Sequence, residues 1–162
     1  MTTIEHAYFS LPRQPVCWLL ACAPNDPDPT TRLDSEPYDA PRSLRILIVE
    51  DEILIALDMR TMLEAGGHTV VGIADTADHA VAAALRERPD LVLLDIALVG
   101  SRDGIDAAIE LRARLDIPSL FITAHPDPIL RQRAQVAKPL GFLAKPLDED
   151  VLRQLLTELQ PM

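Results

Sequence analysis

Five short apolar runs, each followed by a segment with apolar residues at helical spacing, constrain the fold of this chain more than any other feature. The runs are continuously apolar rather than alternating, which is typical of strands buried on both faces. They cover residues 44–49, 69–73, 90–95, 118–123 and 140–144, and the helical segments cover residues 53–67, 77–88, 104–115, 126–136 and 148–159. This alternation predicts an α/β fold, an open parallel sheet with helices on both sides.

Residues 1–43 differ in composition from the rest of the chain. They hold seven of the fourteen prolines, so we expect a mostly disordered N-terminal extension before a folded domain at residues 44–162. The apolar run at residues 16–23 is too short to span a bilayer. We interpret it as an exposed apolar patch in the extension. Two alternatives stay open, an export signal that loosely resembles a lipoprotein box and a misassigned translation start. Cys17 and Cys22 have no second pair or nearby His to complete a zinc site.

The charge of the chain excludes two classes of partner. The net charge is −10 and no Lys/Arg cluster is present, which argues against nucleic acid and against an anionic membrane surface, since both require neutralisation of negative groups. The folded part has no cysteine, so a reducing compartment is compatible with it. We therefore expect a cytoplasmic protein.

Polar side chains follow four of the five predicted strands. Glu50 and Asp51 come after the first, Asp95 ends the third, Thr123 ends the fourth, and Lys145 follows the fifth. Because the carboxyl ends of parallel strands meet at one edge of the sheet, we expect these side chains to lie together. Gathered carboxylates repel one another and call for a positive partner. Hard oxygen ligands select Mg²⁺ or Mn²⁺.

This set of residues predicts phosphoryl chemistry. Asp95 is a carboxylate nucleophile that can form an acyl phosphate. Lys145 and the Thr123 hydroxyl can stabilise the charge that develops on the phosphoryl oxygens. In the resting state Lys145 can pair with Asp95.

At this point the sequence resembles the response-regulator receiver domain of two-component systems over about residues 44–160. The motifs are LIVEDE (47–52), LVLLDIAL (91–98), DG (103–104), FITA (121–124) and GFLAKP (141–146). The resemblance implies a flavodoxin-like doubly wound (βα)5 fold with strand order 2-1-3-4-5. It also implies a metal site at Glu50, Asp51, Asp95 and the backbone carbonyl of Ala97, a phosphoacceptor at Asp95, a phosphate-binding Lys145, switch residues at Thr123 and Phe142, and a cis Lys145–Pro146 peptide.

Several positions depart from the usual pattern of that family. Glu50 stands where Asp is commoner, and Phe142 replaces the commoner Tyr. The loop from Asp95 to Gly104 is one residue longer than usual. Ala97 and His125 are the side chains expected to flank an attacking water, and only His125 can orient one.

We expect the output to be a change in protein binding, because the sequence after the last predicted helix is too short for another domain. The resemblance implies that phosphorylation repacks the face formed by residues 126–160. A homodimer, or docking to an effector, a histidine kinase or a histidine phosphotransfer protein, would use this face. The chain is thus expected to be a phosphoacceptor and not an enzyme. The alternative is a non-phosphorylated pseudo-receiver scaffold; a small phosphatase would need an Asp at position 97.

Overall fold

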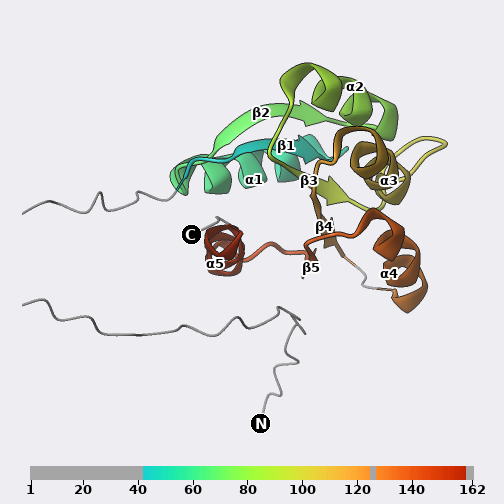
Figure 1. Ribbon diagram of the computed structural model, residues 1–162. Coiled ribbons are helices and arrows are strands. Elements are labelled where there is room, and N and C mark those ends of the chain that lie inside the picture. The colour runs from blue at the N-terminus through green and yellow to red at the C-terminus, as the bar shows by residue number, and fades with distance from the viewer. Residues whose placement is uncertain (1–41, 125–126, 160–162) are drawn as a thin grey trace, which may run out of the picture. The chain divides into compact units, whose positions relative to one another are not determined.

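The computed structural model describes residues 42–124 and 127–159 (Figure 1). The predicted N-terminal extension, apart from residues 42 and 43, lies outside the described residues, and so does the apolar run at 16–23 with its two cysteines. In chain order the elements are β1 (Arg45–Val49), α1 (Ile53–Ala65), β2 (Thr69–Ala74), α2 (Ala77–Glu87), β3 (Leu91–Asp95), α3 (Gly104–Leu115), β4 (Ser119–Thr123), α4 (Pro128–Ala134), the 3-10 helix η1 (Gln135–Ala137), β5 (Gly141–Ala144) and α5 (Glu149–Glu158).

The five strands form one parallel sheet in the order β2-β1-β3-β4-β5. This confirms the flavodoxin-like (βα)5 fold and the strand order that the resemblance implies. β1, β3 and β4 lie in the interior of the sheet, and their last residues stand side by side at its carboxyl edge. Thr123 pairs with Ala144 in the register of β4 and β5, which brings the start of the Lys145 backbone next to the end of β4.

Helices cover both faces of the sheet, as Figure 1 shows, with α2, α3 and α4 on one face and α1 and α5 on the other. Alternate strand residues point to opposite faces. In β3, for example, Val92 and Leu94 pack in the cluster under α2 and α3, whereas Leu91 and Leu93 pack against α1 and α5. All four side chains are at most 2% exposed. The interior strands β1, β3 and β4 are therefore buried on both faces, as predicted, whereas the edge strands β2 and β5 are mostly half-buried.

The helix ends follow local capping chemistry. Asp148 is the N-cap of α5, because its side chain accepts hydrogen bonds from the backbone N–H groups of Asp150 and Val151. The helix predicted at residues 126–136 is shorter in the structure. α4 begins at Pro128, after its N-cap Asp127, and passes into the 3-10 turn at Gln135. The cis Lys145–Pro146 peptide is present as the resemblance implied. Within the described part of the chain, every helix is too short or too polar to cross a membrane.

Candidate functional site

Lys145 joins two carboxylates at the carboxyl edge of the sheet. Its Nζ donates to Oδ2 of Asp95 at 2.6 Å and to Oε2 of Glu50 at 2.7 Å. The side chains of Glu50, Asp95 and Lys145 are 1%, 9% and 16% exposed, so little solvent screens these ion pairs. The contact between Lys145 and Asp95 was predicted from sequence, whereas the equally short contact with Glu50 was not.

The two buried carboxylates of this group carry more negative charge than the single ammonium of Lys145 compensates. Burial raises the pKa of Glu50, and the hydrogen bond from Lys145 offsets this only in part. Burial acts in the opposite direction on Lys145, but its hydrogen bonds to Asp95 and Glu50 prevail and hold the pKa of its ammonium above the ordinary value. One ammonium thus serves two buried carboxylates and does not fully compensate both.

Asp51 completes the acidic group from the exposed side. Glu50, Asp51 and Asp95 each offer a carboxylate oxygen, and these oxygens lie within 4.8 Å of one another. Three hard oxygen donors, one of them with a pKa raised by burial, suit a small divalent cation. The residues that the sequence assigned to a metal are therefore brought together. The part of the Ala97 carbonyl in such a site stays a prediction.

The segment after Asp95 is held against the Asp95 side chain. The backbone N–H of Ala97 donates to Oδ1 of Asp95 at 3.1 Å, while Lys145 holds the other oxygen. Both carboxylate oxygens therefore have a donor, and the orientation of the carboxylate is set from two sides. Sequence analysis assigned no role to the Ala97 N–H, because a backbone donor carries no signal in the residue type.

Gly104, the first residue of α3, contacts the backbone of Asp95. Its N–H donates to the carbonyl of Ile96 at 3.1 Å. A Cβ on Gly104 would lie 1.9 Å from the Asp95 carbonyl oxygen, so a side chain at position 104 would collide with the strand end. The Asp-Gly pair at 103–104 was noted in the sequence without a role, and its glycine is explained by this close approach.

The two predicted switch residues lie on neighbouring strands. Thr123 is buried, and its carbonyl accepts the backbone N–H of Lys145 at 2.9 Å. Phe142 is half-buried and stacks on Phe121 with ring centroids 5.3 Å apart. The guanidinium of Arg131, on α4, lies 5.1 Å from the centre of the Phe142 ring. The aromatic ring is thus covered by a residue of α4. The role of Phe142 as a switch stays a prediction. His125 lies outside the described residues.

Comparison with known proteins gives a family for this arrangement. Residues 46–157 match the family described as the response regulator receiver domain. The phyllosphere-induced regulator PhyR of Methylorubrum extorquens is 40% identical over 108 residues, which are 66% of this chain and 40% of that protein. The transcriptional regulatory protein PdtaR of Mycobacterium tuberculosis is 40% identical over 118 residues, which are 73% of this chain and 55% of that protein.

A solved structure shares the fold at similar identity. The signal receiver domain of a modulated diguanylate cyclase from Desulfovibrio desulfuricans G20 superposes with a TM-score of 0.69 at 39% identity, over 72% of this chain and 93% of that domain. The chain spans about half the length of the curated relatives it matches. The similarity to PhyR and PdtaR therefore concerns only a part of each protein.

Proposed function

This chain belongs to the family of response regulator receiver domains, and from that premise we propose that it accepts a phosphoryl group on the carboxylate of Asp95. The donor would be a histidine kinase or a histidine phosphotransfer protein, as the family resemblance implies. Donors of this kind are found inside cells, so the proposed function requires a cytoplasmic location. The phosphorylated form would signal through altered protein binding.

The observation that carries the proposal is the position of Lys145 between two buried carboxylates. In the transfer, an oxygen of Asp95 forms a bond to phosphorus while the bond from phosphorus to the donor's leaving atom breaks, and the leaving group takes a proton. Lys145 then has a phosphoryl oxygen to neutralise in place of the bare carboxylate. The N–H of Ala97 keeps the attacking carboxylate oriented.

Glu50, Asp51 and Asp95 would hold a divalent cation, with the carbonyl of Ala97 as a further ligand. Mg²⁺, or Mn²⁺ in its place, would supply positive charge to the phosphoryl oxygens. Glu50 is 2% exposed and already bound to Lys145, so its carboxylate is fixed in direction before any cation arrives. The Thr123 hydroxyl lies at the end of β4 and would bind a phosphoryl oxygen as the proposed switch.

The output surface would be the part of residues 126–160 that surrounds α4, β5 and α5. Its exposed apolar side chains are Ile129, Val136 and Val151, which are 74%, 68% and 49% exposed. Apolar side chains of this kind on an acidic domain suit docking to an effector protein or to a second copy of the chain. The names of the relatives describe regulators, and this chain is proposed to act as one.

Incubation with acetyl phosphate and Mg²⁺, followed by intact-protein mass spectrometry, tests the proposal. We expect one added phosphoryl group, absent in Asp95→Asn and when Mg²⁺ is chelated. A wild-type protein that stays unmodified would instead favour the pseudo-receiver scaffold. The paired Glu50, Asp95 and Lys145 argue against that alternative, since a scaffold has no use for buried charges that cost free energy to desolvate.

A further inference from the structure

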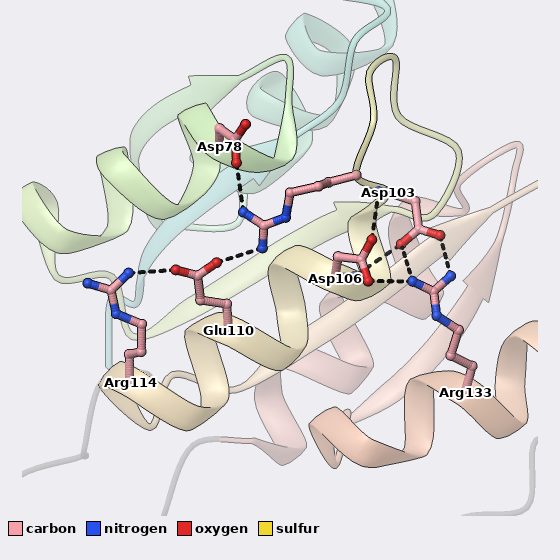
Figure 2. A network of polar contacts seen from close by, with 7 residues as sticks. Asp78, Asp103, Asp106, Glu110, Arg114 and Arg133 are labelled. Carbon is pink, nitrogen blue, oxygen red and sulfur yellow. Dashed lines mark hydrogen bonds and ion pairs between the residues drawn. The ribbon is translucent and has the colours of Figure 1, made fainter.

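A second polar network lies outside the acidic pocket and joins three helices, as Figure 2 shows. In one part of it, Arg102 of the loop before α3 donates to Asp78 of α2 and to Glu110 of α3, each at 2.6 Å. In the other part, Arg133 of α4 reaches the first turn of α3. The receiver chemistry proposed above uses none of these side chains.

Arg133 binds two acids at the start of α3 simultaneously. Its Nη1 donates to Oδ2 of Asp103 at 2.5 Å, and its Nη2 donates to Oδ1 of Asp103 at 3.2 Å and to Oδ1 of Asp106 at 2.5 Å. The Arg–Asp103 contact is bidentate, the geometry that gives an arginine pair direction as well as charge. The side chains of Arg133, Asp103 and Asp106 are 40%, 29% and 37% exposed, so solvent screens the pairs in part.

The two acids that Arg133 binds also begin α3. Asp103 accepts the backbone N–H of Asp106 at 3.0 Å, and Asp106 accepts the N–H of Asp103 at 3.4 Å, so they form a capping box. The next residue, Gly104, packs against the Asp95 carbonyl too closely for any side chain. A displacement of Asp103 through its contact with α4 would therefore be transmitted by Gly104 to the backbone of Asp95, the proposed phosphoacceptor.

The helix that carries Arg133 is attached to the sheet through a different arginine. Arg131 lies over the ring of Phe142, the proposed switch aromatic. α4 is thus tied on one side to β5 and on the other to α3 (Figure 2 shows the α3 side). In the same structure Lys145 is paired with the unmodified Asp95, so this position of α4, with both arginine contacts formed, belongs to the unphosphorylated form.

We propose that Arg133 is a positioning residue that holds α4 in its resting place by binding the capping box of α3. The inference rests on the proposed phosphoacceptance at Asp95. An acyl phosphate at Asp95 carries about 1.5 to 2 negative charges where the carboxylate carried one, so phosphorylation adds up to about one charge and a bulky group beside the strand end on which Gly104 packs. A shift of the start of α3 to accommodate that group would work against the contact of Arg133 with Asp103. The contact therefore opposes phosphorylation.

The expected effect is modest because the pair is partly exposed. Removal of Arg133 should increase the rate of labelling by acetyl phosphate about threefold to tenfold, the range for an oriented, partly exposed arginine pair. A residue with a merely structural role would leave this rate unchanged or lower it. Asp103→Asn tests the same contact from the other side, because Asn is as good an N-cap as Asp but carries no charge.

Labelling by acetyl phosphate with Mg²⁺ is to be measured for wild type, Arg133→Gln, Asp103→Asn and the double variant. Both single variants should accelerate labelling, and the double variant should be no faster than Arg133→Gln, since that variant already removes the contacts of Arg133 with both Asp103 and Asp106. Arg114→Gln is the matched control: Arg114 binds Glu110 at 2.5 Å within α3 and connects no two elements. An unchanged rate in Arg133→Gln, an equal acceleration in Arg114→Gln, or additive effects would overturn the proposal.

Hydrogen exchange on the unphosphorylated proteins separates this inference from the proposed function. Arg133→Gln should increase the exchange of α4 amides and of the Gly104 amide, whether or not any variant accepts phosphate. If wild type is not labelled, the proposed function fails. If wild type is labelled but neither exchange nor rate responds to Arg133→Gln, only the role of Arg133 fails.

Discussion

Replacement of Gly104 by alanine is the most direct test of how closely α3 packs on the phosphoacceptor strand. The added Cβ would stand 1.9 Å from the Asp95 carbonyl oxygen and 2.9 Å from its carbonyl carbon. Real Cβ atoms essentially never come within 3.0 Å of another heavy atom, so the two backbone segments must separate by about an ångström. Neither segment is a side chain that can rotate away.

Two opposing effects set the size of the change. Overpacking of a rigid core contact costs about 3 kcal/mol, the upper part of the usual range, because both partners are backbone. Alanine in place of glycine returns at most about 1 kcal/mol through helix propensity and a less flexible unfolded chain. We therefore expect the free energy of unfolding to fall by about 2 kcal/mol, which lowers Tm by roughly 6–12 °C in a domain of this size.

Urea unfolding and acetyl phosphate labelling measure the two consequences. Displacement of the attacking carboxylate by about an ångström should slow labelling by at least about tenfold. Gly141→Ala is the control, since a Cβ there would meet only side-chain ends, of Leu120 at 3.5 Å and of Leu155 at 3.9 Å. If Gly104→Ala is as stable as wild type and is labelled equally fast, the inferred contact between α3 and Asp95 is wrong.

Asp95→Asn leaves Lys145 one of its two carboxylate partners, so its free energy of unfolding should stay within about 1 kcal/mol of wild type; a markedly lower Tm would contradict this. Lys145→Met removes the cation from two buried carboxylates and should cost about 3 kcal/mol at pH 7 by urea unfolding, whereas wild-type stability would refute the buried pairing. Asp51→Ala should weaken Mg²⁺ binding in a calorimetric titration, and an unchanged affinity would remove Asp51 from the metal site. His68 accepts the N–H of Leu44 through Nδ1, and burial lowers its pKa below the ordinary 6.5. Because the folded protein binds this proton less readily than the unfolded chain does, the contribution of His68 to the free energy of unfolding is fully present above pH 6.5 and decreases as pH falls below that value. His68→Gln should flatten this part of the plot of stability against pH, and identical plots for variant and wild type would exclude the effect.

The sequence was a good guide to the elements because their signals are local. A continuously apolar run such as residues 91–94 identifies a buried strand without reference to any other segment. The polar residues at the ends of four strands were assigned to the site by a single further rule, that parallel strands end at the same edge. Glu50, Asp95 and Lys145 meet there as expected. The largest error in length was in α4, because its end at Gln135 passes into a 3-10 turn.

The contacts that bind the elements to one another could not be predicted in this way. Lys145 reaches Glu50 across 95 positions, and Arg133 reaches Asp103 across 30. Which acid a surface arginine binds depends on the rotation and spacing of two helices, and neither is encoded in the periodicity of one segment. The close approach of Gly104 to Asp95 likewise exists only once α3 is packed on the sheet.

The sequence alone therefore determined the fold class and the residue types gathered at the carboxyl edge, since hydrophobic burial and strand direction follow from local pattern. The tertiary structure decided which charges share a partner, how the Asp95 carboxylate is oriented, and how α4 is attached to α3. These depend on distances of a few ångströms between segments far apart in the chain, and short-range polar interactions are decided at that scale.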